Sequence, residues 1–470
     1  MTLQRNLVWQ RLDHLYRSSV TYQYARYALG LNYGMLPQEV IHQAKRCLLD
    51  NLGCAIGGYE VPGRLMCETM VRQLGGKEEA TVFCSGLRTT ALNATLVNSF
   101  LLKFLEFNDL GGGGHNGDAI PAILAIAERE RASGADFLLS VVISYELGAR
   151  IIGSFVGKSL GARGWSGDMR GGLSMPPALG KLMKLNEDQI ANAIGICASG
   201  SLPLKILDAD REENTMRNHL RFGWVAYDAI LSCLLAQQGF TGPIRIIEGD
   251  NGWRQVLVNG DIDLENMVDF SGWRILATRH KSLPGNGPTT GHVQATIDIV
   301  KEQDLKPEDI ALVLIKTCAQ DFRHTTTPAK KYPRNAESAD HSAFYNHAIA
   351  IKERHFSADS VEPQKFTDPV VLGLIERIRI EIDPDLPNHS YQSTTEITTV
   401  DGRKFQKHVV SPHGYVDDPL TDSELEEKFR KMATRYMDEK QIKQIFNIIW
   451  NIENYDNVSQ LMKLMVFKSR

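Results

Sequence analysis

Several sequence motifs that are typical of metal-binding, nucleotide-binding or hydrolytic sites are absent from this 470-residue sequence. It has no C-x-x-C pair, and its seven cysteines lack the spacing of zinc or iron–sulfur ligands. No P-loop occurs, no G-x-G-x-x-G follows a predicted strand, and no serine nucleophile elbow is recognisable. These absences argue against nucleotide-dependent enzymes and Ser-His-Asp hydrolases. We therefore expect no metal and no cofactor.

A large excess of charge and a long apolar run are also missing. The net charge is −4, which does not suit a surface that neutralises nucleic-acid phosphates. No uninterrupted apolar run reaches membrane-spanning length, and residues 1–16 lack the apolar core of a signal peptide. The cysteines are odd in number and mostly lie in apolar patterns, which indicates buried free thiols. We expect an intracellular, cytoplasmic protein with no nucleic-acid or membrane partner, and mitochondria as the alternative location.

The length and the apolar patterns predict a mainly α fold with two domains. A chain this long exceeds one compact core. Helical spacing is found after Pro37 and at residues 138–147, 190–197 and 227–236, whereas strand patterns appear at 311–316, 377–382, 396–400 and 405–410. We predict a large all-helical domain (1–270), a smaller α+β lid domain (271–414) and C-terminal helices (415–470) that rejoin the helical domain.

The stretch from residue 104 to 128 carries the densest set of reactive side chains. It contains Glu106, Asn108, Asp109, four glycines at 111–114, His115, Asp118, and Pro121 at the start of an apolar helical pattern. Glycines with positive φ would let the backbone bend tightly and approach a ligand. Acids and a histidine at a helix entrance suit proton transfer and carboxylate binding. A solvated acidic loop with a flexible turn is the alternative.

This stretch closely resembles the signature of the MmgE/PrpD family, an Asp-Phe-Asn-Asp element that leads into Gly-His-Pro-Ser-Asp and a helix. The corresponding residues here are 106–109 and 114–118. Further resemblances run along nearly the whole chain, at residues 47–58, 239–243, 332–351 and 412–429. The resemblance implies a large helical domain, a smaller α/β lid, a cleft between them and a homodimer.

The resemblance places proton chemistry in the 104–128 stretch. His115 matches the family's Gly-His motif, and Glu106 stands where the family usually has Asp, so both are catalytic candidates. Glu106 could act as a base or orient the imidazole. Asn108 and Asp109 match the motif as substrate-binding candidates, although we expect at least one to bond loop backbone. A histidine bonded to backbone and a helix-surface acid are the structural alternatives.

A basic group precedes the Gly/Pro-rich turn at residues 284–288. Lys281 stands where the family places a cleft lysine, so it is the third catalytic candidate and a possible carboxylate clamp. His280 beside it is a substrate-binding candidate. With Arg279, these side chains would suit a substrate that bears several carboxylates. A solvated basic turn is the alternative.

Two further stretches resemble those of 2-methylcitrate dehydratases. Lys205 and Arg217 are expected to bind substrate carboxylates, with Arg217 at or next to a family lysine, while the acidic segment 208–214 is expected to be a solvated loop. His341 and Tyr345, one helical turn apart, are the remaining substrate-binding candidates. A structural network that packs lid against body is the alternative for this pair.

The sequence also departs from the family pattern. After Trp165 no histidine follows, and Ser166 or Asp168 fills its neighbourhood. The resemblance implies a cofactor-independent hydro-lyase that dehydrates a 2-alkylcitrate- or 2-methylcitrate-like tricarboxylic acid by general acid–base catalysis. The departures keep three alternatives open: decarboxylation of a cis-aconitate-like acid, epimerisation on the same scaffold, and an inactive member that binds a carboxylated ligand.

Overall fold

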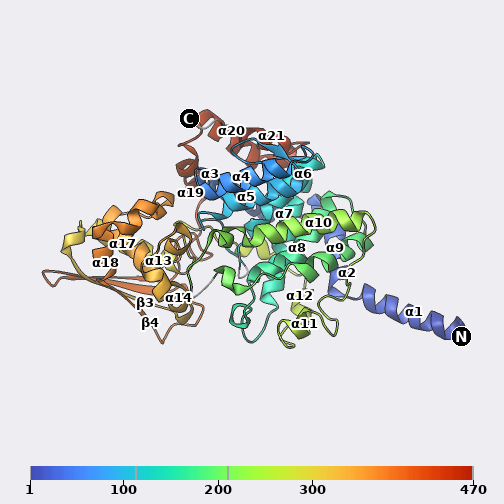
Figure 1. The fold of residues 1–470 in the computed structure, drawn as a ribbon, viewed down its shortest axis with the longest axis horizontal. Coiled ribbons are helices and arrows are strands. Elements are labelled where there is room, and N and C mark those ends of the chain that lie inside the picture. Colours follow the sequence, from blue (N-terminus) through green and yellow to red (C-terminus); the bar gives the residue numbers. More distant parts are fainter. Residues whose placement is uncertain (1, 112–113, 209–210, 468–470) are drawn as a thin grey trace.

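Helices account for most of the fold. The computed structural model describes residues 2–111, 114–208 and 211–467. It confirms the mainly α class, with a large helical part and a smaller α+β part. In Figure 1 the α+β part lies at the left and helix α1 (Thr2–Arg17) extends to the right. Within the described residues, no helix has both the length and the apolar character needed to cross a bilayer.

The helical part, here called the body, comprises α1–α12 and α19–α21. Its further helices are α2 (Val20–Gly30), α3 (Gln38–Gly57), α4 (Pro62–Leu74), α5 (Ala91–Lys103), α6 (Ile120–Arg129), α7 (Gly134–Gly153), α8 (Gly171–Leu182), α9 (Glu187–Gly200), α10 (Arg221–Gln237), α11 (Trp253–Val256), α12 (Leu264–Met267), α19 (Asp422–Ala433), α20 (Glu439–Trp450) and α21 (Ser459–Leu464). Capping boxes at Asn186 and Thr421 satisfy the first backbone N–H groups of α9 and α19. Two short strands, β1 (Ala80–Thr81) and β2 (Arg88–Thr89), pair within the body.

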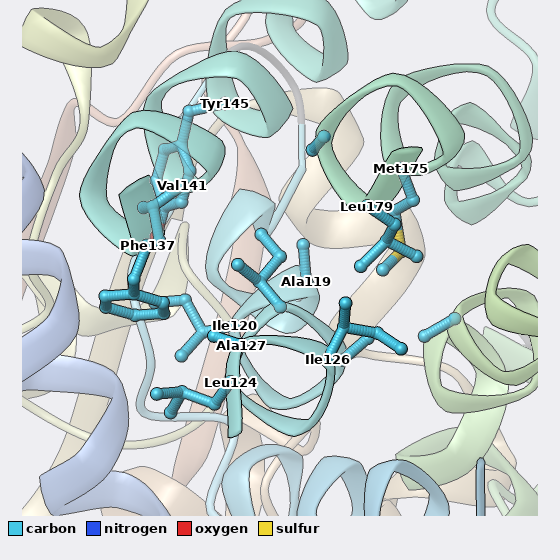
Figure 2. Close-up of a cluster of buried hydrophobic side chains, with 14 of the residues drawn as sticks. Ala119, Ile120, Leu124, Ile126, Ala127, Phe137, Val141, Tyr145, Met175 and Leu179 are labelled. Atoms are coloured by element: carbon cyan, nitrogen blue, oxygen red, sulfur yellow. The ribbon is translucent and has the colours of Figure 1, made fainter. Parts of the chain in front are cut away.

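Helix α6 anchors the 104–128 stretch in the body core. Figure 2 shows its side chains, Ile120 and Leu124 among them, packed between α7 and α8. Pro121 lies in its first turn, where the missing N–H costs no helix bond. All side chains of α6 from Ile120 to Ala127 are buried, so the loop that leads into the helix is fixed at this end.

The α+β part, here called the lid, is built on a four-stranded sheet. Its strands are β3 (Ile310–Thr317), β4 (Ile378–Ile382), β5 (Ser393–Thr399) and β6 (Lys404–Val409), in the order β4-β3-β5-β6. Strand β3 runs parallel to β4 and antiparallel to β5. A hairpin turn at Asp401-Gly402, between the predicted strand patterns 396–400 and 405–410, joins β5 to β6, with Gly402 at φ 88°. The lid helices are α13 (Thr289–Glu302), α14 (Ala319–Thr325), α15 (Pro328–Lys331), α16 (Ala336–Ala339), α17 (Ala343–Glu353) and α18 (Pro369–Ile375).

Two clusters of buried apolar side chains correspond to body and lid. The larger draws on residues 20–275 and 420–467, and the smaller on residues 283–397. Helix α19 packs against α3, so the last segment of the chain returns to the body. The domain boundaries at 270 and 414 stay a prediction.

Candidate active site

Glu106 lies in the loop between α5 and α6, beyond Lys103 at the end of α5. Its φ of 45° is a left-handed conformation that side chains other than glycine rarely adopt. Leu110 and Arg279 hold the same loop by exchanging both backbone hydrogen bonds, at 2.9 and 2.7 Å. Strain of this kind persists only where the surroundings enforce it, and it concentrates at functional sites.

Two glycines of this loop, Gly114 and Gly117, allow neighbouring side chains to lie close to the backbone. A Cβ on Gly114 would lie 2.8 Å from the guanidinium carbon of Arg170, and one on Gly117 would lie 2.3 Å from the amide of Asn51. Gly111 does not have a positive φ, so the tight bend with positive φ that the glycine run could allow is not present at that residue. Residues 112 and 113 lie outside the described residues. At Gly114 and Gly117 the loop requires a small residue, because a Cβ would meet neighbouring side chains.

Asn108 and Asp109 are buried within the body. Asp109 accepts from the amide of Asn51 at 2.8 Å, from the Tyr145 hydroxyl at 2.5 Å and from the Gly117 backbone N–H at 3.2 Å. The Asn108 side chain donates to the side-chain oxygen Oδ1 of Asn51 at 3.2 Å. The expected bond to loop backbone is therefore present. Both side chains hold the loop onto the body, and their assignment as substrate ligands stays a prediction.

The carboxylate of Glu106 is buried among positive side chains. Its Oε2 accepts from Lys103 Nζ at 2.7 Å and lies 3.5 Å from His115 Nε2, while its Oε1 lies 3.8 Å from Arg221. Burial opposes ionisation, but the charges of Lys103 and Arg221 hold the pKa of Glu106 well below its usual range. A carboxylate so stabilised is a weak base, and its position suits orientation of the imidazole.

His115 is held neutral beside this carboxylate. Burial and the positive charges of Lys103 and Lys281 hold the pKa of His115 well below its usual range. Arg170 donates to the His115 carbonyl at 2.6 Å and so fixes the backbone. Within the described residues the buried Nδ1 has no hydrogen-bond partner. A neutral imidazole with one nitrogen facing a carboxylate and the other unpaired suits proton transfer.

Lys281 is fully buried and bonded to backbone. Its Nζ donates to the carbonyls of Glu106 at 2.5 Å and of Gly285 at 2.7 Å. Burial lowers the pKa of Lys281 to about 7, so the amine can carry or release a proton near neutrality. Lys428 of α19 holds this region by donating to the Lys281 carbonyl at 2.9 Å and pairing with buried Asp50.

Arg221 connects Glu106 to two further carboxylates. Its Nε lies 2.7 Å from Asp168 and its Nη1 lies 3.4 Å from Asp208. Asp168 belongs to the segment where the family's histidine is missing, so a carboxylate paired with arginine occupies that neighbourhood. No motif pointed to Arg221; its place one helical turn after Arg217 is the only signal in the sequence. The Glu106 cluster is defined as Lys103, Glu106, His115, Arg221 and Lys281.

Two predicted substrate ligands, Lys205 and His341, meet at Asp208. Lys205 Nζ lies 2.8 Å from Asp208 Oδ2, and His341 Nε2 lies 3.6 Å from Oδ1. The Asp208 side chain is only 18% exposed, so the predicted solvated loop is wrong at this residue. Asp208, His324 and His341 present donor atoms within 4.8 Å of one another and form a group that could hold a metal ion.

The other predicted ligands lie apart from these contacts. Arg217 stacks over the Trp224 ring at 5.6 Å. His280 Nδ1 lies 3.6 Å from buried Asp50. The Tyr345 hydroxyl donates to the Ser360 carbonyl at 2.7 Å, inside the lid core. Their roles in substrate binding stay predictions.

Two surface hollows lie away from these residues. One measures about 1000 Å³ and is lined by residues of α20 and α21, with Tyr455 between them. Another, of about 610 Å³, lies on the lid beside Tyr332 and Phe366. Neither includes a residue of the Glu106 cluster. Glu106 and Lys281 are only 2% and 0% exposed, so neither of these hollows marks the cluster. The site is therefore identified by the reactive groups that meet there.

Known proteins resemble the chain over nearly its whole length. A cis-aconitate decarboxylase-like protein of Aspergillus oryzae is 23% identical over 96% of this chain and 98% of its own. Cis-aconitate decarboxylase of Aspergillus terreus is 23% identical, with 97% and 98% covered. An alkylcitrate dehydratase of a fungal species is 22% identical, with 93% and 92% covered.

Two domain models of one protein family also match the chain along most of its length. The MmgE/PrpD N-terminal domain matches residues 22–265, which are mostly body. The MmgE/PrpD C-terminal domain matches residues 284–454, which include the lid and helices α19 and α20. The chain belongs to the MmgE/PrpD family.

Proposed function

We propose that the protein is a lyase that removes water from a 2-alkylcitrate-like tricarboxylic acid at the Glu106 cluster. The observation that carries the proposal is the neutral His115 imidazole, whose Nδ1 is unpaired among the described residues while Lys281 lies in the same buried cluster. Dehydration needs a base for a C–H bond, an acid for the departing hydroxyl and cations for the carboxylates. The cluster contains groups suited to each task.

In this proposal His115 Nδ1 takes the proton from carbon, and the C–H electrons form the new double bond as the C–O bond breaks. Lys281 gives its proton to the departing hydroxyl, which leaves as water. A pKa of about 7 leaves part of the Lys281 population protonated at neutrality. Arg221 can hold a substrate carboxylate. Substrate entry requires the cluster to open, because Glu106 and Lys281 are buried.

Decarboxylation of a cis-aconitate-like acid is the second candidate, favoured by the similarity to the cis-aconitate decarboxylase of Aspergillus terreus and the decarboxylase-like protein of Aspergillus oryzae. In that reaction the C–C bond electrons stay on the substrate when carbon dioxide leaves, and an acid then protonates the carbon. Lys281 could supply that proton, so the same cluster serves both reactions. The homodimer expected from the resemblance remains part of the proposal, to be tested by sedimentation.

Incubation of the purified protein with citrate, 2-alkylcitrates and cis-aconitate, followed by mass spectrometry, tests these candidates. Loss of water from an alkylcitrate supports the leading proposal, and loss of carbon dioxide from cis-aconitate replaces it with the second. Deuterium uptake from heavy water without mass loss would indicate epimerisation. The His115→Ala protein, prepared in parallel, controls for contaminating enzymes. If none of the acids changes, the proposal of an active lyase is contradicted, and the alternative of an inactive family member that binds a carboxylated ligand is supported.

A further inference from the structure

Four basic side chains surround the carboxylate of Asp208. Lys205 Nζ lies 2.8 Å from Oδ2, while Arg221 Nη1, His324 Nε2 and His341 Nε2 lie 3.4, 3.5 and 3.6 Å from Oδ1. We call Lys205, Arg221, His324 and His341 the basic cage. Such a set of donors is the kind that recognises a carboxylate.

The cage is assembled from both parts of the fold. Lys205 and Asp208 belong to one short 3-10 helix of the body (Lys205–Asp208), and Arg221 is the first residue of α10. His324 comes from α14 of the lid, and His341 from the turn between α16 and α17. Asp208 therefore links body and lid at the point where Arg221 also reaches Glu106.

Asp208 fills the cage only loosely. The charges of Arg221 and Lys205 outweigh the effect of burial and hold the pKa of Asp208 well below its usual range. Among the described residues its Oδ1 is nonetheless buried without a hydrogen bond, and the three basic groups near it lie at 3.4 Å or beyond. A buried charged acceptor without hydrogen bonds is poorly satisfied. A free carboxylate could approach the same donors more closely than one tethered to the backbone.

We propose that Asp208 is an internal substitute for a substrate carboxylate, and that a polycarboxylate must displace it from the basic cage to bind. The inference rests on the proposed function in one respect, that the ligand is a polycarboxylate. It adds a specificity-determining residue, since the tethered carboxylate competes with every ligand for the same donors. Only a ligand with several carboxylates offsets this competition, because its other charges bind at the Glu106 cluster.

A divalent metal ion is the other possible occupant of this place, held by Asp208, His324 and His341. The surroundings favour the anion. Lys205 and Arg221 already pair with the Asp208 carboxylate. A metal ion bound to the same carboxylate would be repelled by both of these positive charges. In addition, His341 Nδ1 lies 2.5 Å from Asp340 and its Nε2 lies 3.6 Å from Asp208, so both ring nitrogens already face carboxylates.

Calorimetric titration with tricarballylate, a saturated tricarboxylate without a hydroxyl to lose, tests the proposal on the full-length protein. Asp208→Asn keeps the side-chain shape and removes the competing charge, so it should bind on the order of tenfold tighter than wild type. Asp208→Ala should behave alike and serves if the first variant folds poorly. Asp456→Asn removes an exposed carboxylate on the body and should leave affinity unchanged.

Equal or weaker binding by both Asp208 variants, or no binding by any protein, overturns the proposal. Saturable binding of Zn²⁺ or Mn²⁺ that Asp208→Asn and His341→Ala both abolish would also overturn it and assign the place to a metal. Turnover is read separately from binding. Tighter binding by the Asp208 variants without turnover of any acid would contradict the proposed lyase and support Asp208 as a substitute carboxylate. Turnover with unchanged affinity in these variants would support the lyase and contradict the role of Asp208.

Discussion

Lys281 Nζ donates to the main-chain carbonyl of Glu106 at 2.5 Å, whereas the carboxylate of Glu106 is bonded to Lys103 at 2.7 Å. One residue with a left-handed backbone thus contacts two buried lysines through two different groups. The carbonyl bears no full charge, so it does not offset the effect of burial as a directly bonded carboxylate would. This explains why the pKa of Lys281 falls to about 7 although an acid lies nearby.

Removal of His115 should abolish most turnover. His115→Ala should lower kcat by roughly 10²–10⁴-fold, the range for loss of general acid–base catalysis. Steady-state kinetics on the accepted acid measures the change, and His14→Ala, which alters an exposed histidine of α1, is the matched control. Near-normal kcat in His115→Ala together with an inactive Glu106→Gln would move proton transfer to Glu106. Activity in both variants would contradict the placement of the site.

Arg221, and not Arg217, should hold substrate. Arg221→Lys loses the planar fork that binds a carboxylate through two parallel hydrogen bonds, so KM should rise on the order of tenfold or more. Arg217→Lys is the matched control and should leave KM nearly unchanged, because this side chain stacks over Trp224. The reverse pattern, measured on folded proteins of equal circular dichroism, would restore Arg217 as the ligand.

The Lys103–Glu106 pair should contribute to stability as a unit. Both side chains are 3% exposed, so Glu106→Gln leaves a buried ammonium without its counter-charge and should cost about 3 kcal/mol in urea unfolding. The double variant with Lys103→Met should recover most of this loss. Glu60→Gln removes the exposed pair with Arg435 and should cost less than about 1 kcal/mol. Additive losses in the double variant would disprove the coupling.

Lys281 should make stability depend on pH above neutrality. Its pKa is about 7 in the folded protein and 10.5 ordinarily, so between these values the unfolded chain binds a proton that the folded protein does not. Stability from this group therefore rises with pH across that window, by up to about 1.4 kcal/mol per pH unit. Urea unfolding from pH 7.5 to 9 should show this slope in wild type and not in Lys281→Met.

Lys443→Met is the control for this slope, because Lys443 is an exposed lysine of α20. It should keep the wild-type dependence on pH. If Lys281→Met also keeps that slope, the amine of Lys281 does not lose its proton in the folded protein near neutrality, and the proposal that its lowered pKa tunes it for proton transfer fails.

The local features of this protein could be predicted from its sequence because they depend on neighbours along the chain. The capping boxes at Asn186 and Thr421, the start of α6 at Pro121 and the hairpin at Asp401-Gly402 each use hydrogen bonds or backbone preferences within a few residues. Glu106 and His115 also meet within one loop. The mainly α class with a mixed lid follows from such periodic and turn signals.

Tertiary structure alone decided which distant charges meet and how strongly burial acts on them. Arg221 joins Glu106, Asp168 and Asp208 only because loops from separate helices converge at the start of α10. Burial, which no local pattern specifies, brings the pKa of Lys281 to about 7. The same packing directs Asn108 and Asp109 into the body, since the direction of a side chain is set by the surface against which its loop packs.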